Sequence, residues 1–399
     1  MKTPRRYDLD VLRVLSVFAV FIHHVCMPFN GDGFHIMNAT HSKVLDDIMV
    51  YFEQFRLPLL FLVSGVGTVY ACKQHSWTHF IKQRSKRLLL PLVFGVLVIV
   101  PPQMYYENPS LYNSFWAGYF QIIEGLETNH LWFIELLFYI SLGCIPLIGF
   151  LKSNKSKKIK EHIQAYTKRF GMLSWVVVLI VLRCSTKYYF PSDSKDLLNL
   201  SFSTYYGFFF VAGILLTHAE SLWEHIANHR RQYLYTVCIV TTLFYTYYLV
   251  PEQWVAPYMP LALRWSLWYA LGAMVSWSVI LTAIGYAKTY ANTPSKWLAY
   301  CNEAVYPFYI LHQTVIVALG YYIIQLESSI LIKIILLFFS ALLCIIAIYT
   351  LLIYRIKILR ILFGMKSTSV YQRPPKMTSN SQNYSNTTQI IEKSTQGHR

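Results

Sequence analysis

The chain has 399 residues, of which 55% are hydrophobic and only 14% charged, with 31 Tyr, 25 Phe and 10 Trp. That balance excludes an ordinary soluble domain and indicates a polytopic membrane protein. A formal net charge of +16 would by itself be compatible with nucleic-acid binding, so the positions of the basic residues decide what the charge means.

Windows of about 20 apolar residues, the length that crosses a hydrocarbon core, predict ten helices. They cover residues 10–29, 51–72, 88–106, 131–151, 171–190, 203–217, 233–250, 260–285, 302–325 and 330–354. If both termini are cytoplasmic, the inner segments hold most of the 35 Lys and Arg, and the outer loops hold only Lys43, Lys187 and Lys195. The positive-inside rule is then obeyed throughout. We therefore predict an all-α polytopic integral membrane protein with about ten transmembrane helices and both termini cytoplasmic, and no nucleic-acid partner.

The first predicted span carries Arg13 near its inner end and the pair His23-His24 beyond its middle. Because eleven residues at 100° each come within about 20° of three full turns, Arg13 and His24 share a helix face, about 16 Å apart along the axis. An ionisable group inside a bilayer is a functional candidate by default. We expect His24 to be functional, and His23, turned about 100° away, to be a structural histidine bonded to a neighbouring helix.

The second and third spans each add a pair of polar residues at a spacing of three. Glu53 and Arg56 lie near the outer end of the second span, where a structural salt bridge is equally compatible. Arg84 and Arg87, in "KQRSKRLLLP", lie at the inner end of the third span. Two guanidinium groups on one face form a fork suited to phosphate oxygens, although basic residues at this depth also anchor ordinary helices.

The fourth and ninth spans hold further polar groups. The fourth opens with "NHLWFIE", which places His130 and Trp132 at the outer interface and Glu135 about one turn deeper. Trp132 fits either an aromatic belt or a surface on which a sugar ring stacks. The ninth span holds Tyr309 and His312, which share a face and belong to either a buried polar network or the wall of a site.

Two remaining features carry weaker signals. The segments "HSWTH" and "HIANH" show the i, i+4 spacing of paired metal ligands but have no clear third ligand, so we predict no metal site. Residues 366–399 are polar and poor in apolar side chains, and are predicted to form a disordered cytoplasmic tail after the membrane domain, residues 1–365.

Five motifs, in order along residues 8 to about 320, resemble the membrane-bound acyltransferase family often called acyltransferase type three. They are Arg13 and His24 within "LDVLRVLSVFAVFIHH", then "RLPLLFLVSG", then Arg84 and Arg87 followed by "LLLP", then "HLWF", and finally "YPFYILH". The stretches "HHVCMPFN" and "PLVFGVLVIVPPQMYYE" look most like the branch that contains the glucan biosynthesis protein that succinylates periplasmic glucans.

The resemblance implies an O-acyltransferase of the bacterial inner membrane. It implies acyl-CoA as a cytoplasmic co-substrate with no bound cofactor, a periplasmic or cell-surface glycan as acceptor, and an essential histidine at His24. Arg13, Arg84 and Arg87 would bind the donor, whose acyl group is acetyl or succinyl. Membrane lipid surrounds such a protein, and a homo-oligomer is compatible with it.

The chemistry of acyl transfer suggests roles for the other candidates. A neutral imidazole can take the proton of an attacking hydroxyl, and the resulting oxyanion needs donors, for which Arg56, Tyr309 and His312 are candidates. Glu135 lies at a depth similar to that of His24 and would orient its ring. His130 and Trp132 are acceptor-side candidates. The alternative is a proton-coupled secondary transporter that uses the same buried polar residues.

Overall fold

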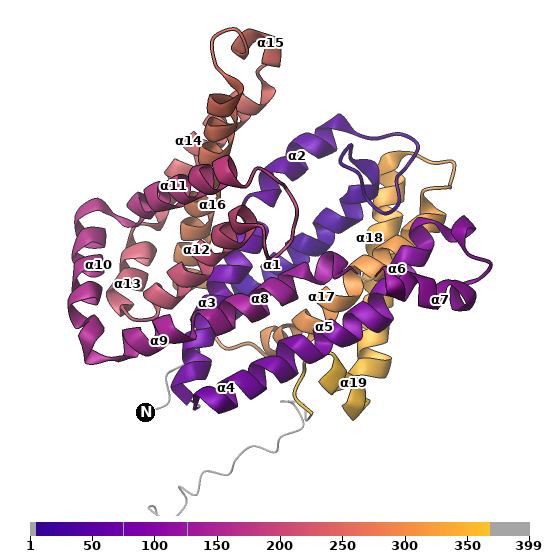
Figure 1. Cartoon of the computed structure of the whole chain (residues 1–399), viewed down its shortest axis with the longest axis horizontal. Coiled ribbons are helices and arrows are strands. Elements are labelled where there is room, and N and C mark those ends of the chain that lie inside the picture. The colour runs from indigo at the N-terminus through magenta and orange to yellow at the C-terminus, as the bar shows by residue number, and fades with distance from the viewer. Residues whose placement is uncertain (1–4, 75, 126, 368–399) are drawn as a thin grey trace, which may run out of the picture. The chain divides into compact units, whose positions relative to one another are not determined.

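The computed structural model describes residues 5–74, 76–125 and 127–367, so the predicted tail lies almost entirely outside the described residues. The described chain is helical, and Figure 1 shows the elements in chain order. The helices are α1 (Tyr7–Cys26), α2 (Lys43–Glu53), α3 (Arg56–Gln74), α4 (Trp77–Arg84), α5 (Leu90–Phe94), α6 (Val100–Glu107), α7 (Phe115–Glu124), α8 (Trp132–Gly143), α9 (Ile145–Lys152), α10 (Lys157–Phe170), α11 (Trp175–Tyr189), α12 (Leu200–Leu216), α13 (Glu220–Asn228), α14 (Arg230–Leu249), α15 (Glu252–Val255), α16 (Leu261–Tyr290), α17 (Lys296–Ile323), α18 (Ile330–Ile348) and α19 (Lys357–Leu362).

Each of the ten predicted spans coincides with helix in the structure. Among the described residues, seven helices are long and apolar enough to cross a membrane, or up to nine if each of two bent pairs, α8 with α9 and α12 with α13, is one span. The remaining predicted span, 233–250, corresponds to α14, whose many Tyr and Thr side chains make it more polar than the others. The polytopic all-helical architecture is therefore confirmed, while the count of ten and the cytoplasmic termini stay predictions.

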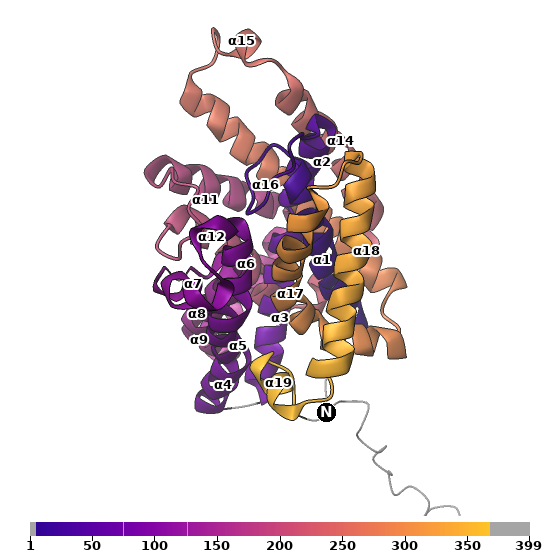
Figure 2. The ribbon, with the colours of Figure 1, turned by 90° about the vertical axis from the view of Figure 1, so that its right-hand side faces the viewer.

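The core is built around α1, which packs against α3, α16, α17 and α18. Figure 2 shows α1, α17 and α18 side by side. Helices α3 and α12 approach more closely still, because each contributes a glycine at the crossing. A Cβ on Gly65 would lie 2.1 Å from the carbonyl oxygen of Phe210, and a Cβ on Gly213 would lie 2.1 Å from that of Leu62. Small residues that let two backbones meet are typical of membrane helix packing.

The third span is irregular where the predicted pair Arg84 and Arg87 lies. Helix α4 ends at Arg84, and two π-helical turns, Ser85–Leu89 and Gly95–Ile99, interrupt the rest of the span. The π-turn widens the helix and turns Arg87 further from Arg84 than a regular α-helix would. As a result Arg84 is half-buried and Arg87 is exposed.

Candidate active site

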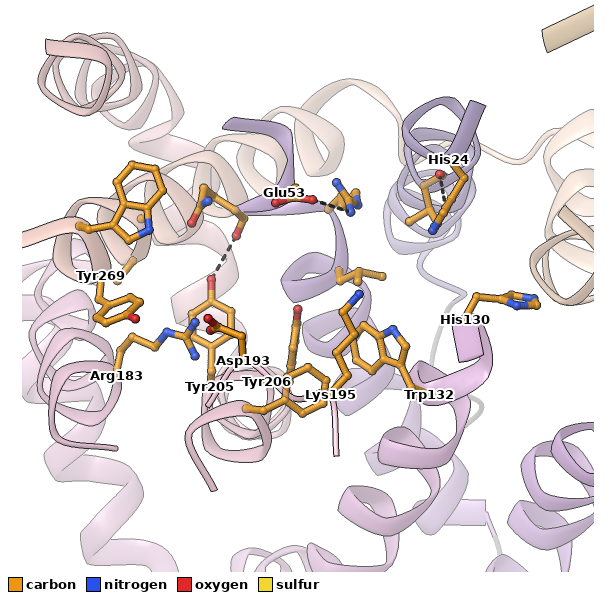
Figure 3. Close-up of a pocket in the computed structure, with 18 of the residues that line it drawn as sticks. His24, Glu53, His130, Trp132, Arg183, Asp193, Lys195, Tyr205, Tyr206 and Tyr269 are labelled. Atoms are coloured by element: carbon orange, nitrogen blue, oxygen red, sulfur yellow. Dashed lines mark hydrogen bonds and ion pairs between the residues drawn. The ribbon is translucent and has the colours of Figure 1, made fainter. Parts of the chain in front are cut away.

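A cavity of about 310 Å³ lies where α1, α3, α8, α11, α12, α16 and α17 meet the segment 191–199. Six of the residues singled out in the sequence line it: His24, Glu53, Arg56, His130, Trp132 and Tyr309. Figure 3 shows His24 and His130 on one side of the cavity and Arg183, Tyr205 and Tyr269 on the other. The segment 191–199 and the start of α16 belong to the predicted outer side, which places the cavity toward that side.

His24 is held by two hydrogen-bonding partners at the same ring nitrogen. Its Nδ1 lies 2.9 Å from the carbonyl oxygen of Val20, one turn earlier in α1, and 3.2 Å from Nε2 of His312 on α17. The Nδ1 of His312 in turn donates to the carbonyl oxygen of Tyr309. His312 therefore carries its proton on Nδ1 and accepts at Nε2, so the Nδ1–H of His24 is shared between His312 and Val20. This tautomer leaves Nε2 of His24 unprotonated and able to accept a proton.

His23 faces a different partner, as its angular offset predicts. Its Nδ1 accepts a hydrogen bond of 2.7 Å from Arg56 on α3, and its Nε2 lies 3.3 Å from a carboxylate oxygen of Glu53. Arg56 and Glu53 are also 3.7 Å apart, the pairing considered from their spacing. The guanidinium of Arg56 is buried at the cavity wall, and its Nε has no hydrogen-bond partner among the described residues. Arg56 thus places its guanidinium at the cavity wall, while its Nε is covered by the protein.

Two hydrogen bonds join the segment of His130 to α17 at the cavity wall. Nε2 of His130 donates to the carbonyl oxygen of Ile310 at 3.0 Å, and the hydroxyl of Tyr309 donates to the carbonyl oxygen of His130. Both ring nitrogens of His312 and the hydroxyl proton of Tyr309 are therefore engaged. Of the three residues considered as oxyanion donors, this geometry favours Arg56.

The walls carry aromatic side chains that the sequence analysis did not single out. Trp132 packs against Phe202 and Tyr206, with ring centroids 4.8 and 5.4 Å away. The others lining the cavity are Tyr205, Trp265, Trp268 and Tyr269. Flat apolar rings with polar edges suit both membrane interfaces and ring-shaped ligands. Their signal in the sequence is only the general excess of aromatic residues.

Three charged residues of the cavity were also missed. Arg183 of α11 lies over the rings of Tyr205 and Tyr269, at 4.5 and 5.2 Å. The segment 191–199 brings Asp193 and Lys195 to the cavity (Figure 3). Lys187 stabilises this segment by donating a hydrogen bond of 2.8 Å to the carbonyl oxygen of Ser192.

Lys195 lies outside the membrane-spanning helices and is exposed overall, but its amine faces the cavity. Burial there, with the Arg56 guanidinium adding to it and Glu53 opposing it, lowers the pKa of Lys195.

The structure brings the three other predicted arginines together, away from the cavity. Arg13 donates a hydrogen bond of 3.2 Å to the side-chain oxygen of Asn302, and its guanidinium lies 3.6 Å from a carboxylate oxygen of Asp10. The guanidinium of Arg84 donates to the hydroxyl of Thr68. Arg13, Arg84 and Arg87 are close enough to interact electrostatically, which makes a basic cluster about 16 Å from His24 along α1.

Glu135 does not take the position suggested by its depth. Among the described residues no hydrogen bond or ion pair joins Glu135 to His24, and the side chain that contacts the ring of His24 is His312. The depth of a residue in the membrane does not give the rotation of its helix about the helix axis. The sequence therefore could not show which neighbour Glu135 faces. Glu303, next to the ninth-span motif, instead pairs with Arg360 at 2.5 Å.

No group of three or more His, Cys, Asp or Glu in the part of the chain that the structure describes is arranged to hold a metal ion. His225 and His229 stack with their centroids 4.0 Å apart. His75, of the other histidine pair, lies outside the described residues.

Comparison with known proteins adds a family and distant relatives. A family described as an acyltransferase domain matches residues 6–350. The protein named glucans biosynthesis protein C is 21% identical over 189 residues in Escherichia coli strain SMS-3-5, which covers 45% of this chain and 46% of the relative. The protein of the same name in Escherichia coli strain K12 is 20% identical over the same length and shares. The chain thus spans about half the length of the curated relatives it matches. No solved structure matches it.

Proposed function

Because the chain belongs to the acyltransferase domain family, we propose that it transfers an acyl group, acetyl or succinyl, from cytoplasmic acyl-CoA to a hydroxyl of a periplasmic or cell-surface glycan. The observation that carries the proposal is the imidazole of His24, which lines the cavity with Nε2 unprotonated and Nδ1 held by His312. A positioned neutral imidazole is the usual general base for activating a hydroxyl.

In the proposed reaction, Nε2 of His24 removes the proton of the glycan hydroxyl as its oxygen attacks the thioester carbonyl. The new C–O bond forms, the C–S bond breaks, and the imidazolium returns the proton to the departing thiolate to give free CoA. His312 accepts the Nδ1–H and so stabilises the imidazolium, the part that an orienting group plays in a catalytic triad. Arg56, whose guanidinium lies at the cavity wall, would stabilise the oxyanion by its positive charge.

The donor and acceptor would approach from opposite sides. The cluster of Arg13, Arg84 and Arg87 offers guanidinium groups to the phosphates of CoA. The pantetheine arm would then follow the face of α1 that joins Arg13 to His24, about 16 Å long. The aromatic wall around Trp132 is the proposed binding surface for the glycan, on the predicted outer side. The relatives named glucans biosynthesis protein C support a glucan as one acceptor to test first.

The direct test uses purified protein in lipid nanodiscs with acetyl-CoA or succinyl-CoA and a glucan acceptor, and measures release of free CoA thiol. We expect release that depends on the acceptor and falls by about 10²- to 10⁴-fold in His24→Ala, the range for losing a general base. His41→Ala is the matched control, since His41 is exposed in the loop after α1. Full turnover in His24→Ala would rule out the proposed base.

A further inference from the structure

A second hollow, lined almost entirely by apolar groups, lies on the opposite face of α12 from the candidate active site and at the other end of α8. Its volume is about 800 Å³, and α8, α10, α11 and α12 form its walls. The lining includes Cys144, Tyr166, Trp175, Phe208 and Leu215. Figure 1 shows α10 at the left edge, alongside α13, with α9 and α11 at its ends. We call this hollow the lateral groove.

The lateral groove offers almost no hydrogen bonding to an occupant. The hydroxyls of Ser203 and Thr204, its polar residues on α12, donate to the carbonyl oxygens of Leu197 and Leu200. The Nδ1 of His162 on α10 likewise donates a hydrogen bond of 2.7 Å to the carbonyl oxygen of Lys158. An interior that is almost entirely apolar favours hydrocarbon over sugars and water.

Two glycines of the groove have empty space beside them. A Cβ added to Gly143, where α8 bends by 42° into α9, or to Gly207 in the middle of α12, would meet nothing within 4 Å. Both residues line the groove. Elsewhere on α12 the glycine at 213 is packed tightly against α3, so the space beside Gly207 is a local feature of the groove.

The groove is long enough for one lipid acyl chain. Its lining on α12 runs from Ser203 to Leu215, a separation of twelve residues that corresponds to about 18 Å of helix. Half of a hydrocarbon core of about 30 Å is close to that length. Val178 of α11 and Tyr166 of α10 are exposed at its rim, so the groove is open to the surrounding bilayer.

The α10 wall of the groove carries positive charge. Helix α10 has five Lys and Arg, against a single Glu. At 100° per residue, Lys158 and Arg169 lie within about 40° of His162, which lines the groove, whereas Lys157 points about 140° away from it. Both Lys158 and Arg169 are exposed. Lys158 and Arg169 are eleven residues, about 16 Å, apart along α10, so the groove combines an apolar slot with cations along its α10 wall.

We propose that the lateral groove is a binding site for one anionic phospholipid, with an acyl chain between α8, α11 and α12 and the phosphate over α10, between Lys158 and Arg169. The predicted inner position of α10 fits this occupant, since anionic lipids attract basic segments beside a membrane helix. A helix with one apolar and one basic face lies at such an interface. Bound lipid would fix the angle of the bent α8, which carries Trp132 at its other end.

Photocrosslinking tests the proposal on the full-length protein in phosphatidylcholine nanodiscs. The probe is a phosphatidylglycerol with a photoreactive group in its acyl chain, and peptide mapping locates the label. We expect label on α12 around Gly207 and on α10. Lys158→Gln and Arg169→Gln should each weaken competition by unlabelled phosphatidylglycerol by about fivefold, the effect of one surface cation. Lys157→Gln, on the opposite face, should leave it unchanged.

A second pair of variants separates the groove from the general lipid surface. Gly207→Phe should fill the slot and remove the α12 label, and its Cβ has room in the fold. Val177→Phe adds the same ring to an exposed position of α11 and should change nothing. Equal labelling by the matching phosphatidylcholine probe, or label that survives Gly207→Phe, would show ordinary boundary lipid and overturn the proposal. Displacement of the label by acyl-CoA but not by phosphatidylglycerol would overturn it too.

Discussion

Replacing His312 by leucine tests whether it positions the base or is itself the base. His312 is almost fully buried, and its Nε2 lies 3.2 Å from Nδ1 of His24. Leucine fills much of the same space and accepts no hydrogen bond. The Nδ1–H of His24 would still reach the carbonyl oxygen of Val20 at 2.9 Å, so the ring keeps one of its two anchors.

The expected fall in kcat is small because the hydrogen bond from His24 to Val20 remains. Loss of one hydrogen bond costs about 0.5–1.5 kcal/mol, which corresponds to a fall in kcat of about 2- to 13-fold. Loss of the base itself would cost about 10²- to 10⁴-fold. Because the missing interaction strengthens as charge develops on His24, kcat should fall while KM for both substrates stays near its wild-type value.

The assay is steady-state release of CoA thiol by His312→Leu, His312→Gln and His24→Ala, each checked for wild-type elution and thermal unfolding. A glutamine side-chain oxygen can accept from His24, so His312→Gln should recover part of the lost kcat. A His312→Leu defect as deep as that of His24→Ala would refute the assignment of His24 as base and His312 as its positioning residue. Unchanged turnover in His312→Leu would refute the contact between the two rings.

Three further predictions concern other parts of the molecule. Arg84→Ala should raise KM for acyl-CoA about tenfold or more, as expected for a lost charge-assisted hydrogen bond, while Lys86→Ala, exposed between the two arginines, should not; equal KM values would exclude Arg84 from donor binding. Because its pKa is lowered, Lys195 should become reactive toward an amine acylating reagent at a lower pH than Lys157, as measured by peptide mapping, and the opposite order would contradict its burial. Gly213→Ala should cost about 1–3 kcal/mol and lower the unfolding temperature, since its Cβ would lie 2.1 Å from the Leu62 carbonyl oxygen, whereas Gly207→Ala should be neutral.

Local periodicity was enough to predict the helices and the faces of single helices. The shared face of Arg13 and His24 follows from 3.6 residues per turn, and the offset of His23 correctly predicted a partner on another helix, Arg56. Hydropathy likewise located a helix at every predicted span, but it cannot decide whether a polar helix such as α14 or a bent pair crosses the membrane.

Contacts between helices that are distant in the sequence could not be predicted from local periodicity. His24 and His312 are 288 residues apart, and only the packing of α1 against α17 brings them together. Glu135 was chosen by depth because no sequence signal gave the rotation of α8 about its axis. Asp193 and Lys195 reach the cavity through the fold of segment 191–199, which depends on hydrogen bonds from Lys187 that have no sequence signature. Arg183 reaches it through the packing of α11 against α12 and α16.

The central claim is that the protein transfers an acyl group between two sides of a membrane with His24 as the general base. It is tested most directly in sealed proteoliposomes. Radiolabelled acyl-CoA is supplied on the side of the basic cluster, a glucan acceptor is supplied only on the other, and alkali-labile label on the glucan is measured. The account predicts labelled glucan with the wild type and His41→Ala, and none with His24→Ala. Equal labelling by His24→Ala, or labelling only when donor and acceptor share one side, would contradict it.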